Sequence, residues 1–313
     1  MQTEKITLNV SASPHLESAA TTPFIMRQVI IALIPATIAG LILFRIRAAL
    51  LIVICVFVSI ATEEVISRIR KKPSTITDYS AALTGLLLAL ILPPTTSWYG
   101  AILGSIFAIL VGKHLFGGLG MNIFNPALIG RAFLMASYPK MLTTYIKPFA
   151  ADSISCATPL ALNKFSQIGT PLTDLFFGGV SGSIGETSAI CLIVGGIYIL
   201  IRKIADWRIP VSMLVTTIVF STILYLTNNA YGSPLFHILS GGLLLGVFFM
   251  ATDPVTTPVT KKGRYVFGIT AAIMIMVIRV FGGLSEGVMY SILFMNALTP
   301  LINRYTKPKR FGA

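Results

Sequence analysis

Ten apolar segments, each long enough to cross a lipid bilayer, constrain this chain more than any other feature of its sequence. A membrane-spanning helix needs about 20 mostly apolar residues. Inside a bilayer the backbone must satisfy its own hydrogen bonds, which favours helices. The sequence therefore predicts an all-α polytopic membrane protein. The expected spans lie near residues 25–44, 48–66, 79–97, 100–116, 122–138, 185–201, 209–226, 235–252, 266–283 and 285–303.

The overall composition agrees with this class. Hydrophobic residues make up 55% of the chain and charged residues 11%, whereas soluble domains carry about 25% charged residues. A chain this apolar has too few polar residues to cover the surface of a soluble protein, which excludes a soluble two-domain fold. The net charge of +13 does not indicate nucleic acid, because Lys and Arg stand in short loops between apolar segments. We therefore expect membrane lipid, and no nucleic acid, as a partner.

The loops between the spans differ in charge from one side of the membrane to the other. Cytoplasmic loops collect Lys and Arg. With the N-terminus inside, the inner loops and tail hold most basic residues: Arg68, Arg70, Lys71, Lys72, Lys113, Arg202, Lys203, Arg208, Lys261, Lys262, Arg264, Arg304, Lys307, Lys309 and Arg310. The outer loops hold Arg45, Arg47, Lys140, Lys147 and Lys164. We predict cytoplasmic tails at residues 1–24 and 304–313, and an outward-facing loop at residues 139–184.

Two stretches in the first half resemble two in the second. GLLLALILPPTT (85–96) resembles GLLLGVFFMATDPVTTP (242–258), and FNPALIGR (124–131) resembles MNALTPLINR (295–304). Repeats with an odd number of helices point in opposite directions, so we expect two inverted five-helix repeats at residues 25–138 and 185–303. Prolines in matching positions predict broken helices near the midplane. The alternative is that Leu- and Gly-rich runs resemble each other through composition alone.

The longest loop contains the polar stretch ADSISCATPLALNKF, residues 151–165. Pro159 pushes Thr158 toward an extended or turn conformation and keeps it out of a helix. Asp152, Ser153 and Ser155 stand just upstream. The Thr158 hydroxyl is therefore expected to be accessible outside the membrane, although by themselves these residues fit an ordinary surface turn.

DSISCATPLA, residues 152–161, resembles the flavin-attachment motif Asp-x-x-Ser/Thr-Gly-Ala-Thr of the RnfD/NqrB family, and three further stretches agree: FNPALIGRAF (124–133), GSIGETSA (182–189) and GVFFMATDPVTTPVTKKGRYVFG (246–268). The resemblance covers essentially the whole chain. It implies FMN bound covalently to Thr158 as a phosphoester, attached by an extracytoplasmic flavin transferase, within a site that includes Ser155, Cys156 and Ala157. Cys156 stands where the family usually has Gly, so a small residue is retained. Riboflavin is a candidate for a second, noncovalent flavin.

The same resemblance implies a function. The chain is expected to be a membrane subunit of an Rnf-type ferredoxin:NAD⁺ oxidoreductase complex in a bacterial or archaeal cytoplasmic membrane. In such a complex, electron transfer drives the translocation of Na⁺ or H⁺. The chain has no Rossmann fingerprint, so NAD and ferredoxin are expected on partner subunits that carry flavin and iron–sulfur centres, and no catalytic residue is expected in this chain alone. The alternatives are the B subunit of a Na⁺-translocating NADH:quinone reductase, a channel or transporter with inverted repeats, and a structural scaffold.

Further candidate residues lie near the predicted span 185–201. Ser183, Glu186 and Thr187 stand where free backbone N–H groups could hold a phosphate or a ring carbonyl. Ser183 and Glu186 could equally form a helix capping box. Arg131 falls inside a span, where a charge needs a partner, so we expect it to pair with an acid or a flavin phosphate. The aromatic residues Tyr138, Tyr145 and Phe149 could stack on a flavin ring or form an interfacial belt.

The other charged residues in or near the spans are expected to play smaller parts. Asp253 and Thr252 offer oxygen atoms for a cation beside a predicted helix break, or form a simple Asp-Pro turn. Arg279 is expected to snorkel outward. Glu63 and Glu64 are expected at a solvated helix end. The three His and three Cys are scattered, so no metal site is expected.

Overall fold

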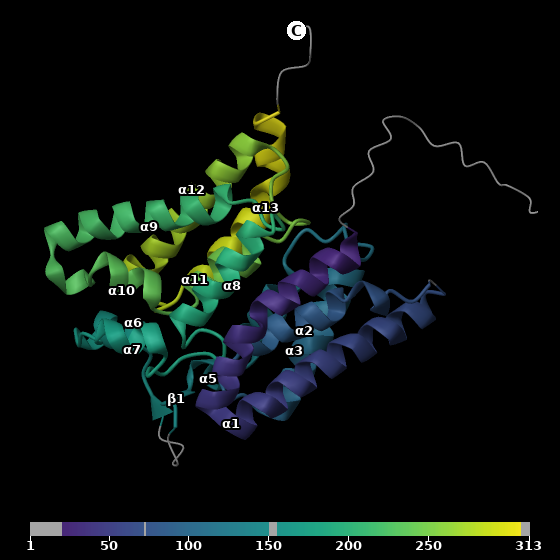
Figure 1. The fold of residues 1–313 in the computed structure, drawn as a ribbon, viewed down its shortest axis with the longest axis horizontal. Helices are drawn as coiled ribbons and strands as arrows, with labels where there is room; N and C mark the ends of the chain where they lie inside the picture. The colour runs from purple at the N-terminus through teal and green to yellow at the C-terminus, as the bar shows by residue number, and fades with distance from the viewer. Residues whose placement is uncertain (1–20, 72, 150–154, 308–313) are drawn as a thin grey trace, which may run out of the picture.

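The computed structural model describes residues 21–71, 73–149 and 155–307, and most of these residues are helical (Figure 1). Within these ranges the one sheet is a short antiparallel pair, β1 (Tyr145–Ile146) and β2 (Ser155–Cys156). The first half of the chain and the second half form two groups of helices side by side, purple to blue and green to yellow in Figure 1.

The first half packs around one long bent helix. Its elements are α1 (Thr22–Ile69), η1 (Ile76–Asp78), α2 (Ser80–Ile91), α3 (Trp98–Ile109), η2 (Leu110–His114) and α4 (Pro126–Ser137). Helix α1 packs on α2 and α3, and α3 packs on α4. The predicted spans 25–44 and 48–66 are therefore present, but they are joined by a kink at Arg45 (φ 51°) and not by a loop.

The second half is more interrupted. Its elements are α8 (Ala189–Ile201), α9 (Arg208–Thr227), η4 (Asn229–Tyr231), α10 (Pro234–Leu239), α11 (Leu243–Leu245), η5 (Gly246–Met250), α12 (Lys261–Phe281) and α13 (Val288–Tyr305). Helix α12 packs on α9 and α13. The halves meet where α8 contacts α1 and where α13 contacts α4.

Several predicted spans have the wrong limits. Helix α2 ends at Ile91, because the following Pro93 and Pro94 cannot continue a helix. The predicted span 235–252 is interrupted between α10 and α11. Helix α8 begins at Ala189 and not at residue 185. The segment before it leaves the helical path because the N–H groups of Ile184 and Gly185 donate to the carbonyls of Leu92 and Leu90, at 3.1 and 2.7 Å. These bonds provide partners for carbonyl groups at the end of α2 that have none within the helix.

The connection between the halves folds over one end of the molecule. It contains α5 (Pro139–Thr143), the two strands, α6 (Pro159–Ala161), η3 (Leu162–Ser166) and α7 (Leu172–Phe177), at the bottom of Figure 1. Asp152 and Ser153 lie outside the described residues.

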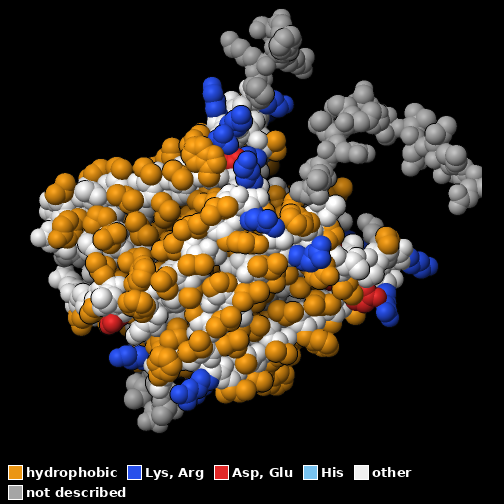
Figure 2. Space-filling model, in the orientation of Figure 1, with side chains coloured by type: hydrophobic (Ala, Val, Ile, Leu, Met, Phe, Trp, Pro, Cys, Tyr) orange, Lys and Arg blue, Asp and Glu red, His pale blue; other side chains and the backbone are white. Residues whose placement is uncertain are grey.

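The outer surface is apolar. Ile42, Val53 and Phe57 of α1 are each at least 60% exposed, and hydrophobic side chains cover most of the face in Figure 2. Helices α1, α9 and α12 are long and apolar enough to cross a membrane, and α2, α3 with η2, α4 and α8 are shorter apolar helices. Contiguous exposed apolar surface of this kind requires lipid or a partner.

Glycines allow the helices to approach closely. A Cβ added at Gly195 of α8 would collide with the carbonyl oxygen of Ala32, and one at Gly85 of α2 would lie 2.5 Å from the carbonyl oxygen of Cys55. Small residues at helix contacts are typical of membrane bundles, where association depends on close packing.

Candidate functional site

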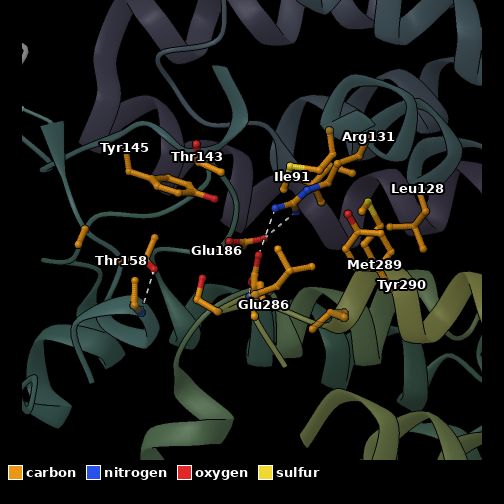
Figure 3. Close-up of a pocket in the computed structure, with 18 of the residues that line it drawn as sticks. Ile91, Leu128, Arg131, Thr143, Tyr145, Thr158, Glu186, Glu286, Met289 and Tyr290 are labelled. Carbon is orange, nitrogen blue, oxygen red and sulfur yellow. Dashed lines mark hydrogen bonds and ion pairs between the residues drawn. The ribbon is translucent and has the colours of Figure 1, made fainter. Parts of the chain in front are cut away.

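A cavity of about 300 Å³ lies between the two halves, beside the connecting loop (Figure 3). That volume is at the lower end of the range of cofactor sites, about 300–1,000 Å³. Its wall combines residues from α2, α4, the loop, the α10–α11 turn and α13: Ile91, Leu128, Arg131, Met135, Thr143, Tyr145, Ala157, Thr158, Ala161, Phe165, Glu186, Gly242, Met250, Gly283, Leu284, Ser285, Glu286, Val288, Met289 and Tyr290. The site therefore requires both halves of the chain.

Thr158 stands on one wall of this cavity. Its backbone is extended (φ −70°, ψ 156°), as the following proline predicted, and its Oγ1 accepts a hydrogen bond from the Ala161 N–H at 3.3 Å. The neighbouring Ala157 carbonyl accepts a 2.6 Å hydrogen bond from the Ser181 hydroxyl. The threonine is half-buried, so its hydroxyl is held at the edge of an enclosed space.

Three charged residues meet at the centre of the cavity, and we call them the interface cluster: Arg131, Glu186 and Glu286. Arg131 Nη1 lies 3.3 Å from Glu186 Oε1, and Nη2 lies 3.1 Å from Glu286 Oε2. Glu286 Oε1 also accepts a 2.5 Å hydrogen bond from the Gly242 N–H. Arg131 thus pairs with two acids. Two carboxylates share one guanidinium, and the more exposed carboxylate is Glu286, with 21% side-chain exposure.

Sequence reasoning missed Glu286. A signal for it exists, because Gly282-Gly283-Leu284-Ser285-Glu286 resembles Gly182-Ser183-Ile184-Gly185-Glu186. Both segments place a glutamate after glycines and just before a helix, α13 and α8 respectively. The tertiary structure brings the two glutamates to the same arginine (Figure 3).

Aromatic rings complete the walls. In Figure 3 the ring of Tyr145 lies on the Thr158 side of the interface cluster, and Tyr290 lies on the opposite side, near Leu128 and Met289. Burial raises the pKa of Tyr145 above its usual range, so this phenol stays protonated and can donate a hydrogen bond. Of the aromatic residues singled out in the sequence, Tyr145 lines the cavity, whereas Tyr138 and Phe149 are exposed and do not.

The other residues of the two predicted flavin-binding motifs lie at the edge of the Thr158 cavity or outside it. Ser155 and Cys156 form β2, which pairs with Ile146 and Tyr145. Thr187 joins Thr158 and Glu186 around a smaller space of about 20 Å³. Ser183 is buried but lines neither space. The predicted capping box of Ser183 and Glu186 is wrong, because the helix begins at Ala189.

Asp253 and Thr252 lie away from this cavity, on a second space of about 60 Å³ that Lys113 also lines. The Asp253 carboxylate accepts hydrogen bonds from the Val255 N–H and the Thr256 hydroxyl, both at 3.3 Å. This is the geometry of an Asp turn. Among the described residues no three His, Cys, Asp or Glu side chains gather as a metal site would require.

A second buried charge cluster lies inside the first half, and we call it the first-half cluster: Glu63, Lys113 and Ser80. Lys113 Nζ lies 2.6 and 2.7 Å from the two Glu63 oxygens and 2.5 Å from Ser80 Oγ. The prediction of a solvated Glu63 is wrong, since η2 packs Lys113 against α1 and leaves the Glu63 side chain fully buried. Glu64 does remain on the surface side, paired with Arg68 at 2.7 Å.

Arg279 does not snorkel. Only 3% of it is exposed, and its Nη1 and Nη2 donate to the carbonyls of His237 (2.6 Å) and Ser240 (3.1 Å) at the end of α10. It is therefore anchored inside the second half and not at its surface.

Comparison with known sequences agrees with this architecture. A sequence model of the NQR2, RnfD, RnfE family matches residues 9–312. The chain belongs to this family. The described residues are mostly helical, and the family is one of membrane proteins, in agreement with the long apolar helices.

Named members of the family cover nearly the whole chain. The D subunit of the Na(+)-translocating ferredoxin:NAD(+) oxidoreductase complex of Acetobacterium woodii is 46% identical over 312 residues, which is 98% of this chain and 96% of that protein. The D subunit of the proton-translocating complex of Clostridium ljungdahlii is 44% identical over 324 residues, 99% and 98% of the two chains. The D subunit of the ion-translocating oxidoreductase complex of Vibrio cholerae is 35% identical over 344 residues, 97% and 99%.

Proposed function

We propose that this chain is the D subunit of an Rnf-type ferredoxin:NAD⁺ oxidoreductase complex, and that it carries FMN as a phosphoester on Thr158. The observation that carries the proposal is the position of the Thr158 hydroxyl, on the wall of a cofactor-sized cavity with aromatic and charged walls. The D-subunit relatives of nearly equal length support the assignment to the complex. In that assembly the chain is one component of a redox-driven ion translocase, not an enzyme alone.

The residues of the cavity fit a flavin. Tyr145 and Tyr290 offer faces against which a flat ring can stack. Arg131 and Tyr145 offer hydrogen-bond donors, and Glu186 and Glu286 supply negative charge beside the ring position. A bound flavin would supply the electron-transfer chemistry, whereas the protein orients the ring and sets its electrostatic surroundings. A separate extracytoplasmic flavin transferase would form the ester bond.

The membrane arrangement that we propose has about ten spans in two inverted five-helix repeats. The two sides of the Arg45 kink in α1, with α2, α3 and α4, form the first set, and α8, α9, α10 to η5, α12 and α13 form the second. Both termini would face the cytoplasm and the 139–184 loop the outside, as the basic residues indicate. NAD and ferredoxin would then bind partner subunits that carry flavin and iron–sulfur centres.

The coupling ion and any second flavin would use other parts of the chain. Relatives of 46% and 44% identity are named for Na⁺ and for protons respectively, so overall similarity does not choose between these ions. The oxygen atoms of Asp253 and Thr252 on the second space are our candidates for an ion path. Riboflavin remains our candidate for a noncovalent flavin.

Two alternatives are weaker. The family also includes NQR2, so the family match alone does not separate this chain from the B subunit of a Na⁺-translocating NADH:quinone reductase; the full-length D-subunit relatives favour the Rnf assignment. A channel or transporter with inverted repeats would carry no flavin and would conduct solute alone.

The decisive experiment is peptide mass spectrometry on the complex made in a host with the flavin transferase. We expect an FMN phosphoester on Thr158, absent from Thr158→Ala. Thr143→Ala is the matched control, because Thr143 lines the same cavity outside the motif; it should keep the flavin. An unmodified Thr158 in a fully active complex would refute the flavin assignment.

A further inference from the structure

A further pocket, of about 170 Å³, lies beside the α6–η3 segment. Its polar wall includes Asn163, Lys164, Gln167, Tyr231, His237 and Arg279. We call it the Arg279 pocket. Two side chains of this wall carry a full positive charge, and none of the described residues that line it is Asp or Glu.

The charge of Arg279 is buried, and no acid among the described residues forms a direct ion pair with it. Its Nη atoms are used by the two carbonyls of α10, but its Nε is buried and has no hydrogen-bond partner. No described carboxylate lies within the 4.0 Å of an ion pair. Glu286 and Glu186 act on Arg279 only from farther away, and both are already paired with Arg131. Carbonyl dipoles and carboxylates that another arginine shares balance a buried guanidinium only in part, since removing a charge from water is costly.

Lys164 adds a second cation, which is half-buried and also donates to backbone carbonyls. Its Nζ donates to the carbonyls of Ile278 (3.3 Å) and Leu284 (2.9 Å), and to that of Gly282. Burial lowers the pKa of Lys164. None of the described acids pairs with it either, so the pocket concentrates positive charge at the end of the molecule that the loop covers.

His237 also contributes an unused atom. Its Nε2 donates to the Tyr231 carbonyl at 2.7 Å, and its Nδ1 is buried without a partner. With Nε2 as the donor, Nδ1 of the neutral ring is an acceptor, so the donors that the wall retains for a negatively charged ligand are the amides of Asn163 and Gln167 and the Nε of Arg279.

We propose that the Arg279 pocket binds a phosphate-type oxyanion. Its volume suits a phosphate group better than a whole nucleotide, because cofactor sites begin at about 300 Å³. Thr158 does not line it, so the proposal does not depend on a flavin at that residue. The phosphate belongs either to the headgroup of an anionic lipid or to free inorganic phosphate.

Thermal unfolding of the full-length chain in a neutral detergent tests the proposal. Inorganic phosphate is compared with chloride at equal ionic strength, and dioleoylphosphatidylglycerol with dioleoylphosphatidylcholine. Ligands that bind only the folded state raise the unfolding temperature, here by about 2 °C or more at saturation. A rise with phosphate identifies a free anion, and a rise with phosphatidylglycerol alone identifies a lipid headgroup.

Gln167→Glu provides the specific variant. Gln167 is exposed, so this substitution adds a negative charge to the wall without removing the contacts of Arg279 or Lys164. We expect the unliganded variant to be at least as stable as the original chain, because the new carboxylate faces two cations, and to lose the ligand-induced rise. Thr173→Glu, an exposed position of α7 outside the pocket, should keep the rise. The proposal is overturned if neither ligand stabilises the original chain, or if Gln167→Glu responds as strongly as Thr173→Glu.

Discussion

The two buried charge clusters are built from similar residues but differ in stoichiometry and surroundings. In the first-half cluster one lysine meets one glutamate, both fully buried, with hydroxyl groups around them. In the interface cluster one arginine meets two glutamates, and Glu286 stays partly exposed at a 300 Å³ cavity. The first arrangement is complete without a ligand. The second leaves negative charge beside a space that a cofactor can enter.

This difference suggests a structural role for the first-half cluster and a functional role for the interface cluster. A closed, neutral pair inside one half can join α1 to η2, and its charges are balanced before any ligand binds. A charged cluster that spans both halves and lines the cavity responds electrostatically to whatever occupies that cavity. Perturbed charge in a cleft is the more typical mark of a functional site.

The largest effect is expected from Lys113→Met. It leaves Glu63 as an unpaired, fully buried carboxylate, which costs about 3–5 kcal/mol. The unfolding temperature and the yield of folded protein in detergent measure this loss. The double variant Glu63→Gln/Lys113→Met should recover most of the stability, because no charge remains. If Lys113→Met alone were as stable as the original chain, the first-half cluster would not have the structural role that distinguishes it from the interface cluster.

Arg131→Met should destabilise the protein less, by about 1–3 kcal/mol. Its two glutamates face a cavity and can be hydrated there, unlike Glu63. Unfolding curves recorded side by side with Lys113→Met test the ranking. A larger loss for Arg131→Met would mean that the interface cluster is the main structural one.

Glu286→Gln should change the cofactor more than the fold. With FMN on Thr158, removal of a nearby negative charge should raise the flavin reduction potential by about 30–60 mV, which is about 0.7–1.4 kcal/mol for one electron. A redox titration of flavin absorbance in the complex measures it. Glu64→Gln, at an exposed site outside the cavity, is the control and should leave the potential unchanged.

The smallest effect is expected at a third, more open cluster. Asp206 pairs with Arg208 at 2.8 Å and also with Arg264. Burial alone would raise the pKa of Asp206, but the Arg208 N–H and the two guanidinium groups outweigh it and lower that pKa. Its stabilisation is therefore present above the unfolded pKa of about 3.9 and is lost as the pH falls through the lower folded value.

Asp206→Asn should accordingly cost about 1 kcal/mol or less at neutral pH. Its unfolding temperature should meet that of the original chain only in strong acid, below about pH 4. A gap between the two chains that widens as the pH falls would contradict the lowered pKa.

Thr158 and Glu286 show how far the sequence predicts the site. Pro159 predicted the extended backbone of Thr158 because the proline ring acts on its immediate neighbour, and the structure confirms it. Glu286 was missed because its partner Arg131 is 155 positions away in the chain. No local pattern in the sequence specifies such a pairing.

The sequence by itself determined the class of the protein and the approximate positions of its apolar helices. Hydrophobicity is a property of each short segment, so lipid as solvent can be inferred from segments alone. Only the tertiary structure decided where helices break and which charges meet. Helix α8 begins at Ala189 because the end of α2 takes the preceding N–H groups, and Glu63 is buried because Lys113 packs against it. Both outcomes depend on contacts between elements distant in sequence, and such contacts exist only once those elements are packed together.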